Sequence, residues 1–252
     1  MQGMSIETED EILFPPTLRR AGHVVAVALR ELRRRVQAGV STGELDRVAG
    51  RVFARHGARS APMLVYDAPC QVFISVNDEA VHGVPGPRRL RRGDLVKLDV
   101  TAELDGFYAD ACVSVAVAPA APGVRRLMSA ADAALASGMT AAVAGAPVRA
   151  ISEAVAREAA AGRVSVLEDL GGHGIGRTIH EQPSVPNVPD PDDPTRLHSG
   201  LVITIEPILG AGGAGIRPES DGWTLRTADG ALAAHVEHTI VVTAGRPLVL
   251  TA

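Results

Sequence analysis

The sequence predicts an α+β fold made of two related halves, in which a curved antiparallel sheet is covered by helices. One reason is that the order of helix, helix, strand and hairpin occurs twice along the chain. A second reason is a weak internal echo, in which Ala38-Gly39 recurs as Ala144-Gly145. Such a repeat favours two α+β halves packed about a pseudo-two-fold axis.

The chain is long enough for one large domain, because it has 252 residues of which 46% are hydrophobic. We expect an N-terminal arm over residues 1–16 and a single domain over residues 17–252. The two pseudo-repeats are expected at about 17–120 and 121–245.

Composition narrows the class of protein. The net charge of −4 does not favour DNA binding, and we expect the arginine clusters at 33–35 and 88–92 to be solvated surface rather than RNA contacts. Two cysteines, Cys70 and Cys112, are too few for a disulfide framework and suit a reducing compartment. With neither a signal peptide nor a membrane span recognisable, a cytoplasmic protein is expected. We also expect a monomer.

The first half begins with two helices. One is expected from Thr17 to about Gln37, and a capping box from Ser41 to Glu44 opens another that ends at Gly57. A short strand over Gln71–Val76 then leads to His82, which stands just before a Gly/Pro turn. A lone histidine there is more often structural than catalytic.

The segment Gly93–Val117 predicts a hairpin that turns at Asp105-Gly106. In that register Asp99 and Asp110 are diagonal neighbours on one face, with Cβ atoms roughly 7–8 Å apart. Two carboxylates in so apolar a hairpin must share a proton or bind a cation. The alternative is a solvent-facing edge, and ligand-type residues elsewhere in the chain favour the metal site.

The second half opens with helices expected at about Val124–Val143 and Val148–Ala161. A glycine-rich segment follows with His173 and His180, which we expect to converge in an irregular loop. A proline-rich surface loop is predicted over Pro183–Pro194.

The C-terminal part is expected to be mostly strand. Leu201–Glu206 alternates as a strand does. Gly210–Gly215 matches the dinucleotide-binding glycine pattern, but no helix follows, so a plain loop is predicted. Trp223–Thr227 and Ala231–Thr243 are expected to pair as a last hairpin through a turn at Asp229-Gly230.

Ligand-type residues stand on four of these segments. They are Asp99, Asp110, His173, Glu206 and Glu237. Four carboxylates and one imidazole suit two bridged divalent ions of Mn, Fe, Co or Zn, and the lack of thiolates argues against structural zinc. Ions about 3.5–4 Å apart can activate a shared water and polarise a carbonyl.

The motifs VHGVPG, LDVTAELDGFYADA, GGHGIGRTIHEQPSVPN, TIEP and EHTIVVT resemble type I methionine aminopeptidase. The resemblance extends from about Ala21 to Thr243. It implies the pita-bread fold and a cytoplasmic metallo-exopeptidase that removes the initiator methionine. Nascent proteins would be its substrates, with the ribosome as a candidate partner.

The resemblance also implies roles for the site residues. Glu206 would shuttle a proton of the attacking water, His180 would steady the oxyanion and His82 would contact the scissile amide. One ion would be held by Asp99, Asp110 and Glu237. The other would be held by Asp110, His173, Glu206 and Glu237.

The pocket for the substrate side chain departs from the family pattern, which has cysteines and aromatics. The positions expected to line it are Pro62, Val65, Ala68, Phe73, Ile179 and Trp223. We therefore expect intact chemistry with a looser preference for methionine.

Other functions are compatible with the same motifs. One is a pita-bread peptidase of altered specificity, which would cut before proline, serve a specialised pathway or replace an inhibitor-sensitive copy. A prolidase-like enzyme usually carries a long N-terminal domain, and only about 90 residues precede the hairpin. Another is a peptide-binding module without activity, which would typically have lost metal ligands, whereas all five remain.

Overall fold

The computed structural model describes residues 15–252. Most of the arm expected over residues 1–16 lies outside this range, and Pro16 already belongs to a helix. The helices are α2 (Pro16–Arg33), α3 (Thr42–His56), α4 (Ala61–Tyr66), α5 (Pro122–Ala141) and α6 (Arg149–Gly162). The strands are β1 (Arg59–Ser60), β2 (Phe73–Val76), β3 (Glu79–Val81), β4 (Leu95–Leu104), β5 (Phe107–Ala116), β6 (Ser165–Val166), β7 (Gly171–Gly174), β8 (Glu181–Pro186), β9 (Val202–Ile205), β10 (Ile208–Gly210), β11 (Ile216–Pro218), β12 (Leu225–Thr227), β13 (Ala233–His235), β14 (His238–Val241) and β15 (Leu248–Val249).

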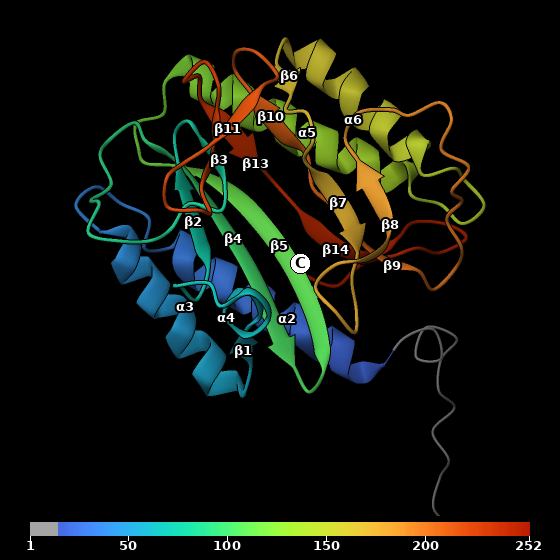
Figure 1. Cartoon of the computed structure of the whole chain (residues 1–252), viewed down its shortest axis with the longest axis horizontal. Coiled ribbons are helices and arrows are strands. Elements are labelled where there is room, and N and C mark those ends of the chain that lie inside the picture. The colour runs from blue at the N-terminus through green and yellow to red at the C-terminus, as the bar shows by residue number, and fades with distance from the viewer. Residues whose placement is uncertain (1–14) are drawn as a thin grey trace, which may run out of the picture.

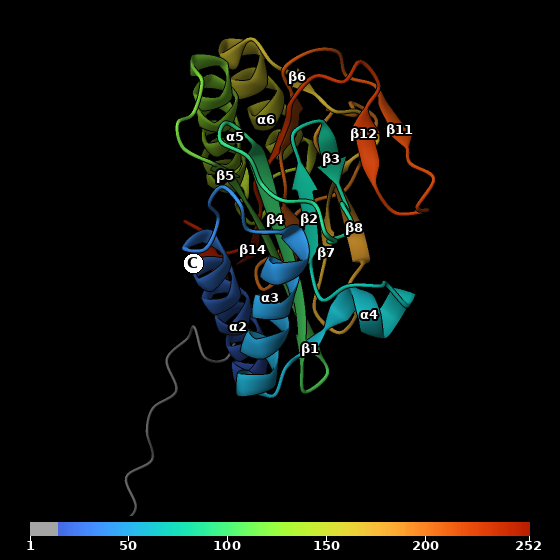
Figure 2. The same ribbon diagram turned by 90° about the vertical axis from the view of Figure 1, so that its left-hand side faces the viewer.

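The molecule is an α+β structure with its long helices on one side of curved antiparallel sheets, as expected. Figures 1 and 2 show α2 and α3 behind β4 and β5, and α5 and α6 behind the strands of the second half. One main sheet has the order β1-β4-β2 with β5 also paired to β4, and the other has the order β15-β14-β9-β7-β8. Each half buries its own apolar core between helices and sheet.

The central hairpin of β4 and β5 forms in the predicted register. Asp99 lies opposite Cys112 and Thr101 lies opposite Asp110. The turn residues Asp105 and Gly106 both have positive φ, as a two-residue hairpin turn requires. All ten residues of β4 are buried, because helices cover one face and the second half of the chain covers the other. The alternative of a solvent-facing edge is therefore wrong.

The two main sheets meet along β5. The backbone N–H of Glu237 donates to the carbonyl of Cys112 at 2.9 Å, and the N–H of Cys112 donates back at 3.4 Å. Residues that come late in the sequence are thereby set beside the first hairpin. Side chains from both halves can therefore point into one shared space.

Several helix boundaries agree with the sequence prediction. The capping box between Ser41 and Glu44 is present, and Gly57 ends α3 in a left-handed conformation. Helix α2 ends at Arg33, four residues before the expected Gln37. The short helix α4 was not predicted, because six residues carry too little periodic pattern.

Some predictions for the second half are wrong in part or in full. His173 lies in β7 and not in a loop, whereas His180 lies in the loop between β7 and β8, as expected. The surface loop predicted over Pro183–Pro194 starts later, because β8 extends to Pro186. The expected last hairpin does not form, since β12 pairs with β11 and β3 whereas β13 pairs with β10. These errors arise because distant strands decide the pairing.

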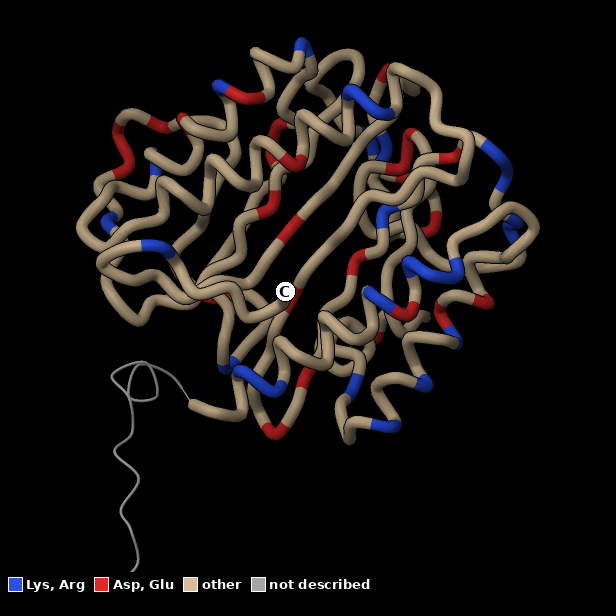
Figure 3. Tube along the Cα trace, turned by 180° about the vertical axis from the view of Figure 1, so that it is seen from behind, with Lys and Arg blue, Asp and Glu red and all other residues tan. Residues whose placement is uncertain are grey.

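Acidic residues reach the centre of the fold. Figure 3 shows some acidic segments, in red, within the central strands and others on outer helices and loops, whereas most basic segments, in blue, lie on outer helices and loops. Within residues 15–252, no helix combines the length and hydropathy needed to cross a membrane.

Candidate metal centre and active site

A cavity of about 360 Å³ lies where the two halves meet. Its lining includes every residue that the sequence suggested for metal binding and catalysis, namely Asp99, Asp110, His173, Glu206, Glu237, His82 and His180. The convergence is a product of the fold, because these residues come from both main sheets and from loops between strands.

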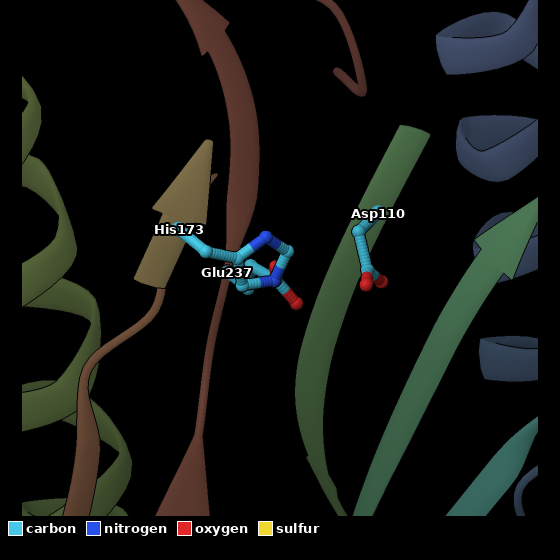
Figure 4. A group of neighbouring side chains, drawn as sticks. All are labelled: Asp110, His173 and Glu237. Atoms are coloured by element: carbon cyan, nitrogen blue, oxygen red, sulfur yellow. The ribbon is translucent and has the colours of Figure 1, made fainter. Parts of the chain in front are cut away.

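One group of side chains has the geometry of an ion-binding set. Donor atoms of Asp110, His173 and Glu237 lie within 4.8 Å of one another. Figure 4 shows that they come from β5, from β7 and from the segment between β13 and β14. Their side chains reach into the same space, so a single cation between them can contact all three.

The glycines around His173 allow β7 to pack closely against its neighbours. A Cβ at Gly172 would lie 2.3 Å from the carbonyl oxygen of Thr204, and a Cβ at Gly174 would lie 2.2 Å from that of Gln182. Neither distance is tolerable for a side chain. The sequence correctly showed a need for close backbone approach, but a strand meets that need here.

The ring of His173 is oriented for coordination. Its Nδ1 lies 2.9 Å from the carbonyl oxygen of Gly174, so Nδ1 carries the proton and donates it there. Nε2 then offers its lone pair and lies 3.6 Å from Oε1 of Glu206. A backbone hydrogen bond of this kind is usual behind a metal-binding histidine.

Three threonines fix the carboxylates and the strands that carry them. Thr101 donates its hydroxyl to Oδ2 of Asp110 at 2.8 Å, and Thr204 donates to Oε1 of Glu206 at 3.3 Å. Thr239 donates to the backbone carbonyl of Asp110 at 2.7 Å and accepts the N–H of Asp110 at 2.9 Å. The acidic side chains are therefore held in place before any ligand arrives.

The four carboxyl groups are unfavourable as a set of bare charges. Loss of hydration raises the pKa of Asp99, Asp110 and Glu237, and raises that of Glu206 to about 7. The nearby carboxylates push the pKa of Asp99 and Glu237 further in the same direction.

Some buried polar atoms of this cluster have no hydrogen-bond partner within the described residues. They are Oδ1 of Asp110, Oε1 of Glu237 and both ring nitrogens of His235. Buried polar atoms nearly always have a hydrogen-bond partner, so these unpartnered oxygens and nitrogens indicate that the cavity binds a ligand. Oxygen and imidazole donors suit divalent cations of the Mn, Fe, Co and Zn type, so these residues fit the expected ions.

Two further cavity histidines, His82 and His180, are neutral at neutral pH. The low polarity of the cavity wall lowers the pKa of His82 and of His180 to about 4. The ring of His180 lies 4.2 Å from that of His173, between centroids. His82 has a φ of 56°, a strained backbone conformation of the kind concentrated at functional sites.

The apolar wall of the cavity is more aromatic than the sequence suggested. Phe73 lies 4.9 Å from the His82 ring and 5.7 Å from Trp223, measured between ring centroids. The lining also includes Pro62, Tyr66 and Ile179.

Two of the positions expected in this wall lie elsewhere. Val65 is 42% exposed and is not among the lining residues, and its neighbour Tyr66 reaches the cavity instead. Ala68 is buried in the cluster behind Phe73 and Trp223. The short helix α4 causes the difference, because it rotates Val65 outward.

Sequence reasoning gave no role to two further residues of the cavity, Tyr66 and His235. The hydroxyl of Tyr66 lies 2.5 Å from Nδ1 of His180. No local pattern reveals that contact. His235 had a usable signal, since it stands two residues before Glu237 and therefore shares its face in an extended chain.

Comparison with known proteins identifies the family. Residues 16–244 match the model of metallopeptidase family M24. Methionine aminopeptidase 2 of Bacillus subtilis is 40% identical over 236 residues, which cover 93% of this chain and 95% of that protein. A methionine aminopeptidase structure from Rickettsia prowazekii superposes with a TM-score of 0.91 at 32% identity, covering 99% and 100% of the two chains.

A more distant likeness concerns the fold alone. The prolidase of Pyrococcus furiosus superposes with a TM-score of 0.75 at 21% identity, and the match covers 98% of this chain but 65% of the prolidase. Sharing an architecture with both kinds of peptidase confirms the expected pita-bread fold. By family match and by identity, the chain belongs to metallopeptidase family M24 and, within it, to the methionine aminopeptidases.

Proposed function

We propose that this protein removes the N-terminal methionine from peptides and newly made proteins with the help of two divalent cations. The observation that carries the proposal is the convergence of four carboxylates and His173 on one cavity beside two neutral histidines. The names of the relatives supply the substrate class.

The cations would be held by Asp99, Asp110, His173, Glu206 and Glu237, and Asp110 and Glu237 would serve both. When bound, they supply Lewis-acid activation of the scissile carbonyl and of the attacking water. The free α-amine of the substrate would bind at this centre. That requirement would restrict cleavage to the first residue of a chain.

Glu206 is the proton carrier in this proposal. Its carboxylate is almost buried and is steadied by the hydroxyl of Thr204. The backbone carbonyl of Glu206 also accepts the side-chain N–H of Asn187 at 2.8 Å. A base fixed in this way can take a proton from the attacking water and deliver it to the leaving amine.

His180 and His82 act as neutral hydrogen-bond donors. An N–H of His180 would stabilise the negative charge that develops on the carbonyl oxygen, a contribution of the size known for single oxyanion donors. His82 would bind the scissile amide from the other wall of the cavity. Both remain uncharged at neutral pH, because their pKa values are lowered to about 4.

The methionine side chain would lie against Phe73, Trp223 and Ile179. Aromatic rings favour a thioether through contacts worth about 0.3–1.5 kcal/mol each. The wall is rigid where Phe73 is packed between His82 and Trp223. Methionine therefore remains the preferred residue in our proposal, despite the departures from the family pattern.

The test is a digestion of peptides that differ only in their first residue. The metal-free protein is reloaded separately with Mn, Fe, Co or Zn, and the released amino acid is identified. Release of methionine from free but not acetylated peptides supports the proposal. Release of proline-preceding residues, or no release with any metal, contradicts it.

For the cell, we propose that the substrates are nascent chains in the cytoplasm and that the enzyme works as a monomer near the ribosome. The two free, buried cysteines support a reducing compartment. Ribosome co-sedimentation and light scattering test the association and the oligomeric state.

A further inference from the structure

His235 lies among the residues of the candidate metal centre, but neither of the ligand sets described above includes it. The residue is 2% exposed and lines the cavity. Neither ring nitrogen has a hydrogen-bond partner within the described residues. A buried imidazole with no partner is rare and calls for a ligand.

The backbone of His235 is held firmly against β5. Its N–H donates to Oγ of Ser114 at 3.0 Å, and its carbonyl accepts the Ser114 hydroxyl at 2.9 Å. The side chains of His235 and Glu237 project to the same side, since their donor atoms lie within 4.8 Å of one another. The ring is therefore aimed at the carboxylates by the sheet itself.

Distances from the ring match shared coordination better than hydrogen bonding. Nε2 of His235 lies 3.4 Å from Oε2 of Glu206 and 3.8 Å from Oε2 of Glu237. Both exceed the range of about 2.7–3.2 Å for N–H···O bonds. Donor atoms each about 2.1 Å from one tetrahedrally bound ion lie roughly 3.4 Å apart.

The same three residues form a second donor set. Donor atoms of Glu206, His235 and Glu237 lie within 4.8 Å of one another, as do those of Asp110, His173 and Glu237. Glu237 belongs to both sets and can bridge them. Each set contains two carboxylates and one imidazole.

We propose that His235 is a metal ligand, which binds an ion together with Glu206 and Glu237. This rests on the proposed metal-dependent function. The centre then has two imidazole ligands, His173 and His235. Since imidazole favours Zn, Fe and Co over the oxygen-preferring Mn and Mg, the extra ring biases the site toward the former.

The first experiment needs no variant. The wild-type protein is saturated with Zn, its metal content is measured, and X-ray absorption counts the imidazole ligands. Two imidazoles per chain are expected. A single imidazole per chain overturns the proposal, whatever the activity.

The second experiment compares His235→Gln with His198→Gln, in which an exposed histidine is replaced. Calorimetric titration of the metal-free proteins should show Zn affinity lowered about tenfold or more by His235→Gln, with a smaller loss for Mn. The control should bind as wild type does. Circular dichroism of the metal-free variants checks that both are folded.

The alternative role for His235 predicts different results. A ring that only donates a hydrogen bond to Glu206 can also support metal affinity, but it would leave a single imidazole per chain in the X-ray absorption count, and that outcome overturns the proposal. Failure of the proposed function is separate. It appears as a wild-type protein that binds metal but releases no methionine.

Discussion

The hydroxyl of Tyr66 lies 2.5 Å from Nδ1 of His180, although the two residues are far apart in the sequence. Burial lowers the pKa of His180 to about 4, so the ring is neutral at neutral pH. If the tyrosine O–H donates to Nδ1, the ring proton must reside on Nε2. That is the tautomer a donor to the oxyanion needs, which makes Tyr66 a positioning residue for His180.

The first prediction concerns this pair. Replacing Tyr66→Phe should lower kcat about tenfold, because the ring loses its fixed tautomer, while His180→Ala should lower kcat by roughly 10²–10³. Metal content should stay unchanged in both variants. In the His180→Ala background, Tyr66→Phe should have no further effect on kcat. Additive effects in the double variant would show that the tyrosine acts independently.

The second prediction concerns Glu237, which belongs to both donor sets and is 2% exposed. Glu237→Gln should remove at least one bound ion per chain and abolish activity, because a neutral amide cannot bridge two cations. Elemental analysis after dialysis measures the loss. The exposed Glu168→Gln serves as a matched control and should retain full metal content. Normal metal content in Glu237→Gln would exclude a bridging role.

The third prediction concerns pH and the metal-free protein. Burial raises the folded-state pKa of Glu206 to about 7 from an ordinary value near 4.5. Between these values the folded state holds a proton that the unfolded state has released. The contribution of this group to stability is therefore present below pH 4.5 and is lost as pH rises through 7.

The size of that loss is on the order of 3 kcal/mol for a shift this large. Denaturant unfolding of the metal-free protein at pH 5 and pH 7.5 should show Glu206→Gln gaining stability over wild type only at pH 7.5. The lowered pKa values of the cavity histidines change stability with pH in the opposite direction. Their contribution is the same in wild type and variant, so it cancels in the difference between the two unfolding free energies. An equal difference at both pH values would mean that Glu206 ionises normally in the folded protein.

The fourth prediction concerns the substrate pocket. Phe73→Ala removes the ring between His82 and Trp223, so it should raise kcat/KM for Phe-starting peptides relative to Met-starting ones. Ile179→Phe fills the same cavity and should sharpen the preference for methionine over leucine. Discrimination of about 1–3 kcal/mol is the range that an apolar pocket supplies.

Rates for Met-, Leu- and Phe-starting peptides in the three proteins provide the measurement. Val65→Ala is the matched control, because Val65 projects away from the cavity and is 42% exposed. Unchanged rate ratios in both Phe73→Ala and Ile179→Phe would show that the methionine side chain binds elsewhere.

Local chemistry determined much of the first half. The Asp105-Gly106 turn alone sets the register that places Asp99 opposite Cys112. Such turns leave two strands only one low-energy pairing. The capping box at Ser41 was readable for the same reason, since its bonds span three residues. The residue types on four predicted segments indicated the five carboxylate and imidazole residues that the cavity gathers, and the family motifs agreed with them.

Tertiary structure decided what depends on distant partners. The sequence predicts that β12 and β13 pair as a hairpin, but β12 pairs with β3 and β13 pairs with β10. The contact of Tyr66 with His180, and the unpartnered ring of His235 beside Glu206, exist only because the two main sheets join along β5. Pairing between distant strands is set by the packing of the whole sheet, which no local pattern of residues encodes.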